Sequence, residues 1–224
     1  VAQTGDLRRA FVVARKLGHD ELAYYPAATG EQRWRLVYPE PFGDFVDDAV
    51  ARGELTPRAR VYAIMRQESG FRADATSPAA AYGLMQLLLP TARGLAEPDD
   101  GPIDRASLRD PEINIRLGAR YLESLMQRLQ HPALVAAAYN VGSRRLCGWL
   151  EKRSGMAIDE FVESIPYPAT RDYVRSVVRN EAVYGYLDTG GLRPLSFRMP
   201  ARCDARGEAV FENAEDAEDA EAAE

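Results

Sequence analysis

Hydrophobic residues recur every three or four positions along most of the chain, and this spacing predicts helices. The clearest case follows Asp110-Pro111-Glu112, a typical helix start. From there one apolar stripe runs through positions 113, 117, 121, 125 and 129. No segment alternates for long between apolar and polar residues, as a half-buried strand would. We therefore expect an all-α fold, or one that is nearly so.

The same pattern predicts several other helices, separated by stretches rich in Gly, Pro and Ala. Residues 1–35 look helical, and residues 34–39 look extended. Residues 71–82 and 97–102 are expected to be loops, because they lack periodicity and contain turn-forming residues. The remaining helices are predicted at residues 42–53, 57–68, 90–95, 132–139, 144–152 and 168–187.

These elements divide the chain into four parts. Residues 1–37 form a helical appendage, too short to bury its own apolar face, and residues 38–190 form the main domain. Residues 191–211 are expected to be an irregular C-terminal wrap. Residues 212–224 form an acidic low-complexity tail, which we expect to be largely disordered.

The most informative stretch is the helix that leads to Glu68. Thr56-Pro57 is a favourable start, because Thr can cap the free backbone N–H groups. Val61, Ile64 and Met65 share one face, and Glu68 is the next position on it. Ser69-Gly70 ends the helix, so the negative helix pole and the apolar surroundings both raise the pKa of Glu68. A general acid needs such a pKa, although a structural pairing with Arg66 or Arg72 is the alternative.

Charge and composition exclude several classes of protein. The net charge of −6 comes from the tail, which holds seven of the 34 acidic residues; without it, 28 basic residues face 27 acidic ones. No basic stripe suggests nucleic-acid binding, and no apolar run approaches the roughly 20 residues of a membrane span. Because the chain begins at Val1, we expect it to be a processed or trimmed product.

Cysteine and histidine usage is sparse. Cys147 lies in a helical stretch and is expected to be a buried thiol; a disulfide with Cys203 is the alternative and would need an oxidising compartment. His19 and His131 are isolated, so no metal site is expected, and no cofactor.

Several short motifs occur together in a fixed order. They are Ile64-Met65-Arg66-Gln67-Glu68-Ser69, Ser77, Gly83-Leu84-Met85-Gln86 and Ala138-Tyr139-Asn140. In this combination the chain resembles the catalytic domain of soluble lytic transglycosylases, over roughly residues 38–187. The resemblance implies a lysozyme-like fold, peptidoglycan as substrate and Glu68 as the catalytic acid.

The resemblance also implies substrate contacts. Ser77 would bond an acetamido group, although it could instead cap loop backbone. Gln86 offers a donor and an acceptor to an N-acetyl group, and Met85 would pack under the cleft. Tyr139 would present its ring to a sugar and extend its hydroxyl to Glu68. Asn140 would contact substrate or cap the turn at Gly142, and Tyr82 is a candidate aromatic wall.

Three positions depart from the family pattern. Ala80 stands where the family usually has Gly, and Pro90 comes one position late. Ala169, in Ile165-Pro166-Tyr167-Pro168-Ala169-Thr170-Arg171, replaces a Glu that in relatives helps to hold the substrate. Arg171 and Tyr173 remain and are expected to support the fold.

The expected reaction uses one carboxyl, because the substrate supplies the nucleophile. The resemblance implies that the muramoyl 6-hydroxyl closes on its own anomeric carbon, leaving a 1,6-anhydromuramoyl end. Asp74 is the nearest candidate for the second carboxyl that most glycosidases need. If Asp74 had this role, the chain could be a goose-lysozyme-like hydrolase. A second alternative is a non-catalytic module that only binds peptidoglycan.

The expected partner and location follow from this interpretation. The partner is the peptidoglycan glycan strand, with neither nucleic acid nor a membrane span involved. We expect a monomer in the periplasm or elsewhere in the cell envelope.

Overall fold

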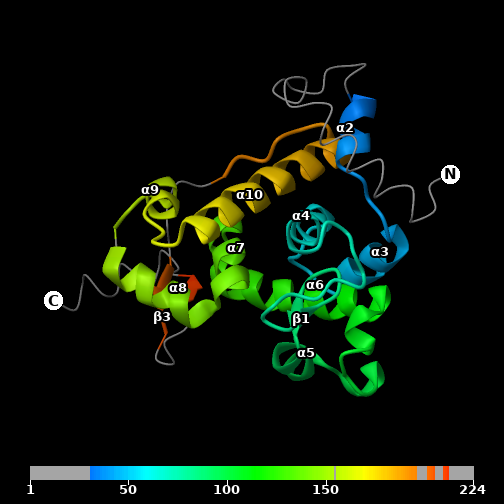
Figure 1. Ribbon diagram of the computed structural model, residues 1–224. Coiled ribbons are helices and arrows are strands. Elements are labelled where there is room, and N and C mark those ends of the chain that lie inside the picture. The colour runs from blue at the N-terminus through cyan, green and yellow to red at the C-terminus, as the bar shows by residue number, and fades with distance from the viewer. Residues whose placement is uncertain (1–30, 154, 196–200, 205–208, 212–224) are drawn as a thin grey trace.

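The computed structural model describes residues 31–153, 155–195, 201–204 and 209–211 (Figure 1). Within these ranges the chain is mainly helical, with two small pairs of antiparallel strands. The expected fold class, all-α or nearly so, is confirmed. None of the helices in the described ranges combines the length and the apolar character needed to cross a membrane.

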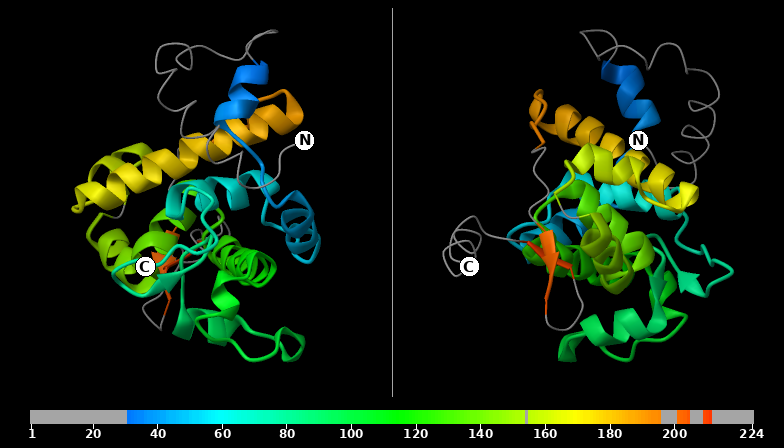
Figure 2. Two further views of the ribbon diagram at one scale, coloured as in Figure 1. Left: turned by 45° about the vertical axis from the view of Figure 1, so that its right-hand side comes forward. Right: turned by 90° about the vertical axis from the view of Figure 1, so that its left-hand side faces the viewer.

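Helix α4 (Arg58–Glu68) lies at the centre of the fold. Every residue from Ala59 to Met65 is buried. Helix α10 (Pro168–Thr189) crosses α4 and also packs against α7 (Pro132–Val141), as Figures 1 and 2 show. A buried ion pair joins α4 to α10: Arg60 Nη2 lies 2.6 Å from Glu181 Oε1. The first turn of α4 is thereby fixed against α10.

Helix α6 (Pro111–Leu129) supports α4 from a second side. Its predicted start is confirmed, since the Asp110 side chain accepts a hydrogen bond from Ile113 N. Glu123 on α6 organises the segment that leads into α4, and accepts hydrogen bonds from the backbone N–H groups of residues 54, 55 and 56. The Thr56 hydroxyl also donates to Glu123, at 2.8 Å. Our prediction that Thr56 caps α4 is therefore wrong; Pro57 is the N-cap and makes no side-chain bond.

The buried apolar residues form two clusters. The larger one contains the apolar faces of α4, α7, α10 and much of α6, together with α3 (Gly43–Ala51). The smaller one consists of Tyr82, Leu87, Ala92, Ile103, Leu108 and Leu117. Tyr121 and Tyr139 pack against both clusters. These two rings therefore mark the boundary between the two parts of the core.

The smaller cluster lies under a loop that carries the Gly83–Gln86 motif. In this loop, two antiparallel strands of two residues each, β1 (Ala81–Tyr82) and β2 (Leu87–Leu88), pair with each other. Helix α5 (Leu89–Leu95) follows. Asn114 is fully buried, accepts from Met85 N, and donates to the carbonyl oxygens of Tyr82 and Leu108. A Cβ at Gly83 would lie 2.2 Å from the Leu108 oxygen, and φ there is +80°. The loop therefore requires a glycine at residue 83.

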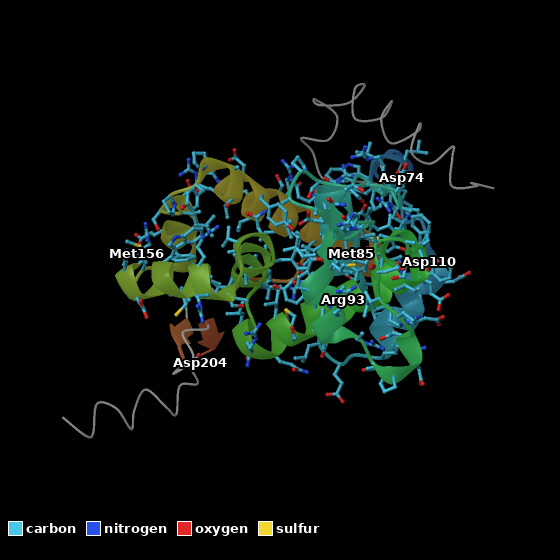
Figure 3. All side chains as sticks on the ribbon, turned by 60° about the horizontal axis from the view of Figure 1, so that its bottom comes forward. Asp74, Met85, Arg93, Asp110, Met156 and Asp204 are labelled. Carbon is cyan, nitrogen blue, oxygen red and sulfur yellow. The ribbon has the colours of Figure 1, made fainter. Side chains whose placement is uncertain are left out.

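Two expectations, one for residues 191–211 and one for Cys147, need correction. Residues 191–211 were expected to be irregular, but β3 (Ala201–Cys203) and β4 (Ala209–Phe211) form a hairpin that packs on α8 (Ser143–Leu150). Figure 3 shows Asp204 beside α8. Cys147 on α8 is buried but disulfide-bonded, so it is not the free thiol that we expected. The other short elements are α9 (Ile158–Glu163) and the 3-10 turns Pro98–Asp100, Ser107–Arg109 and Glu151–Arg153.

The segment before the main domain is also helical where it is described. Residues 34–39 were expected to be extended, but α2 (Glu31–Val37) covers most of them. Arg35 pairs with Glu31 one turn earlier and donates to the carbonyl of Leu187 at the end of α10. Residues 31–35 were predicted to be helical, and these contacts help to carry the helix on to Val37. The predictions for residues 1–30 and 212–224 lie outside the described residues, and the four-part division stays a prediction.

Candidate active site

Glu68 is the last residue of α4 and the only carboxyl on its buried side. The preceding stripe residues, Val61, Ile64 and Met65, are fully buried, and Glu68 itself is partly buried. Burial raises the pKa of Glu68 from 4.5 to about 7, and a hydrogen bond from Tyr173 opposes this rise. Near neutral pH a part of the molecules therefore holds the proton that a general acid must donate.

Tyr173 is the direct partner of Glu68. It lies on α10, and its hydroxyl donates to Glu68 Oε1 at 2.5 Å. Burial, together with the nearby Glu68 charge, raises the pKa of Tyr173 well above its usual value, so the phenol stays a donor. Because Oε1 accepts this bond, the acid proton belongs on Oε2. We expected Tyr173 to support only the fold, and its contact with Glu68 was not predicted.

Neither nearby arginine acts as a counter-ion for Glu68. Arg66 Nη1 donates to the Val37 carbonyl at 2.6 Å, and its guanidinium lies over the Tyr38 ring. Arg72 Nε donates to the carbonyl of Ser69. The pKa of Glu68 is set by burial and by Tyr173, without a contribution from either arginine. The structural alternative, an ion pair that would keep Glu68 ionised, is therefore wrong.

Tyr139 lies close to Glu68 but makes a different contact from the one predicted. Its hydroxyl donates to the Met85 carbonyl at 2.8 Å rather than to Glu68. The pKa of Tyr139 is raised by burial and by the charge of Glu68, which places the two side chains in the same site. The Tyr139 ring also packs on Tyr121, with centroids 5.1 Å apart. The site therefore lies at the boundary between the two core clusters.

The loop residues of the motif mostly brace the loop itself. Met85 is fully buried, as predicted, and lies near the middle of the molecule in Figure 3. Gln86 Nε2 donates to the Gly83 carbonyl at 2.8 Å, and Ser77 Oγ accepts from Ala81 N at 3.1 Å. Ser77 therefore has the capping contact that was the alternative for it. Its hydroxyl proton and Gln86 Oε1 keep no partner among the described residues.

The remaining candidates lie around this centre or outside it. Asn140 Oδ1 accepts from the Thr170 hydroxyl at 2.9 Å and does not cap the turn at Gly142. Tyr82 is 5% exposed and has the Arg109 guanidinium over its ring, so little of this ring is open to a sugar and its role as an aromatic wall stays a prediction. Asp74 is exposed and lies at the edge of the molecule in Figure 3. No second carboxylate among the described residues affects the pKa of Glu68.

The described residues contain no cluster of His, Cys, Asp or Glu suited to a metal ion. The side chains of this site offer acid–base chemistry by one carboxyl, held by one phenol, beside the rings of Tyr121 and Tyr139. A carboxyl of this kind can protonate a leaving oxygen and then act as a base.

A family model described as the transglycosylase SLT domain matches residues 48–162. The chain belongs to this family. The match contains Glu68, the loop with Met85 and Gln86, and Tyr139, whereas Tyr173 lies beyond its end. The family predicted from the motifs is confirmed.

Known proteins of the family are similar over the same region. The chain is 36% identical over 161 residues to the soluble lytic murein transglycosylase of Escherichia coli strain K12. The matched region covers 70% of this chain and 24% of that protein. The crystal structure of the 70 kDa soluble lytic transglycosylase from Escherichia coli is 30% identical, with a TM-score of 0.66, over 82% of this chain and 30% of that one. The structure of a complex of the 70 kDa soluble lytic transglycosylase with bulgecin A has a TM-score of 0.67 and 28% sequence identity. The match covers 92% of this chain and 32% of that one.

The expected catalytic-domain fold is confirmed by these structures. The chain spans about a quarter of the length of the curated relatives that it matches first.

Proposed function

We propose that this protein is a murein lytic transglycosylase. It would cleave the β-1,4 bond between N-acetylmuramic acid and N-acetylglucosamine without consuming water. The observation that carries the proposal is Glu68, a partly buried carboxyl with a pKa of about 7 and a single hydrogen-bonding phenol. Membership of the transglycosylase SLT domain family supports the substrate class.

The reaction needs Glu68 twice. As an acid, Glu68 gives the proton on Oε2 to the glycosidic oxygen, and the bond from that oxygen to the muramoyl anomeric carbon breaks. As a carboxylate, it then takes the proton of the muramoyl 6-hydroxyl, whose oxygen bonds to the anomeric carbon. The proton count balances, and the product is a 1,6-anhydromuramoyl end. The intramolecular nucleophile needs no second carboxyl, in agreement with the position of Glu68 away from other acids.

Substrate contacts are proposed for groups that keep hydrogen-bonding capacity. The Ser77 hydroxyl and Gln86 Oε1 are available to an acetamido group, and Asn140 keeps its amide N–H₂. The partly exposed Tyr139 would offer its ring to a sugar face. Met85 contributes its carbonyl, which holds the Tyr139 hydroxyl.

We further propose that the protein acts in the periplasm or elsewhere in the cell envelope, as a monomer and without a cofactor. The murein substrate lies in that compartment. The disulfide at Cys147 supports the location, because disulfides persist in oxidising compartments.

The test is a mass analysis of muropeptides released from purified murein by the wild type and by Glu68→Gln. We expect products that carry 1,6-anhydromuramoyl ends from the wild type, and a loss of at least about 100-fold in rate for the variant. Products heavier by one water would indicate a hydrolase of the goose-lysozyme type. Unchanged lysis by Glu68→Gln would remove this residue from the mechanism.

A further inference from the structure

Two adjacent arginines stand in the first turn of α8. Arg144 and Arg145 are both exposed, and neither forms an ion pair or a side-chain hydrogen bond within the described ranges. The first turn of α8 contains no acidic residue. The positive pole of a helix disfavours cations, so this placement slightly destabilises the helix. The fold therefore gives no reason for two guanidinium groups here.

Two acidic residues of α9 and α10 are engaged by a third arginine. Glu163 and Asp172, from α9 and α10, both pair with Arg175. Ala169, in the first turn of α10, is exposed and carries no charge. Among the described residues, neither Arg144 nor Arg145 is paired with an acidic side chain.

A pair of aromatic rings, tilted by 50° to each other, lies beneath one of the two arginines. The Trp149 ring is 8% exposed and lies 5.7 Å from the Tyr167 ring, which is 51% exposed. The Arg145 guanidinium lies 5.9 Å from the centre of the Tyr167 ring. A guanidinium over an aromatic face is attracted to it and keeps its N–H groups free for another partner. The Tyr167 ring therefore supports the exposed Arg145 guanidinium without occupying its N–H donors.

This surface adjoins the candidate active site. Tyr167 is the N-cap of α10, and Tyr173, which bonds Glu68, follows six residues later. At about 1.5 Å per residue, the two positions are roughly 9 Å apart along the helix. Between them, Thr170 bonds Asn140 at the end of α7, and α8 follows directly after Gly142. A murein strand at Glu68 would therefore pass close to Arg144 and Arg145.

We propose that Arg144, Arg145 and Tyr167 bind the carboxylate groups of the peptide attached to the murein strand. The inference rests on the proposed function. The sugars of the strand are neutral, whereas its peptides carry carboxylates, which guanidinium groups bind through paired N–H donors. The protein would then cleave strands with free peptide carboxylates faster than strands without them.

The experiment compares kcat/KM on two preparations of the same murein strands, one with free peptide carboxyls and one with those carboxyls amidated. We expect the wild type to prefer the free carboxyls by roughly fivefold, the size expected for two exposed charge contacts. Arg144→Gln/Arg145→Gln should lower this ratio to about one. Added salt should lower the wild-type ratio, because exposed charges are screened.

The matched control is Arg52→Gln. Arg52 is likewise an exposed arginine without a partner in the described part of the chain, and it lies at the end of α3. This control should keep the wild-type ratio. An unchanged ratio in the double variant, or an equal loss in Arg52→Gln, would overturn the proposal while the lytic activity stands. A wild type that cleaves neither preparation would instead overturn the proposed function.

Discussion

Two opposing influences set the behaviour of Glu68. Burial at the end of α4 favours the protonated carboxyl, whereas the Tyr173 hydroxyl favours the ionised form. Their balance gives a pKa of about 7, at which one group can serve as acid and then as base. The apolar stripe of α4 made Glu68 predictable from the sequence. The hydrogen-bond partner of Glu68 could not be predicted from this stripe. Tyr173 lies 105 residues away and contacts Glu68 only because α10 packs on α4.

Replacing Tyr173 by Phe should raise the pKa of Glu68 further. The change removes the one hydrogen bond that lowers this pKa and leaves the burial in place. A hydrogen bond to a charged group contributes about 1.5–3 kcal/mol, so the limb of the pH–rate profile assigned to Glu68 should move up by about 1–2 pH units. The measurement is kcat against pH on murein strands. A profile that keeps its wild-type limb would show that Tyr173 does not act on Glu68.

Replacing Glu68 by Gln should stabilise the fold above neutral pH. The folded-state pKa is raised, so the native carboxyl is favourable only while protonated, and stability falls as the pH rises from 4.5 through about 7. The penalty reaches about 3 kcal/mol above pH 7, and a neutral Gln avoids it.

Urea unfolding at pH 5 and pH 8 measures this effect. The advantage of Glu68→Gln over the wild type should be larger at pH 8. Glu160→Gln, an exposed carboxyl on α9, should show no such change between the two pH values. An equal advantage for Glu68→Gln at both pH values would contradict the raised pKa.

At the scale of elements, the loop that carries Met85 and Gln86 depends on α6. The periodicity predicted α6 and its start at Pro111 correctly, since both follow from local signals. It gave no sign that Asn114, a polar residue in the same helix, bonds three backbone groups of the loop region. The extension of α2 beyond the predicted helical residues was missed for a related reason: Arg35 bonds the carbonyl of Leu187 at the end of α10.

Replacing Asn114 by Ala should destabilise the fold and reduce activity together. The change leaves Met85 N and the carbonyls of Tyr82 and Leu108 buried without partners. We expect a loss of about 3 kcal/mol in unfolding free energy, since each unsatisfied buried group costs about 1–3 kcal/mol. Denaturant unfolding measures this loss. The control Gln127→Ala, at an exposed position of the same helix, should change stability by less than about 0.5 kcal/mol. Equal stability of both variants would contradict the role of Asn114.

At the scale of the whole molecule, the site lies where the two apolar clusters meet. Tyr121 and Tyr139 contact both clusters, and Glu68 reaches this boundary from the end of the central helix. The family and the mainly helical fold were predictable from ordered motifs and from periodicity. The hairpin of β3 and β4 was not, because its strands are three residues each and pack on α8, far earlier in the chain. The hydroxyl contact of Tyr139 was likewise mispredicted, since this hydroxyl bonds the Met85 carbonyl and not Glu68.

The central claim is that Glu68 is a carboxyl poised to give up a proton near neutral pH. Its most direct test is an NMR titration of the glutamate side-chain carboxyl carbons in ¹³C-labelled wild type, with Glu68→Gln to identify the resonance. We predict a resonance, missing in the variant, that titrates with a pKa of about 7. Titration of the same resonance near the ordinary value of 4.5 would contradict the account.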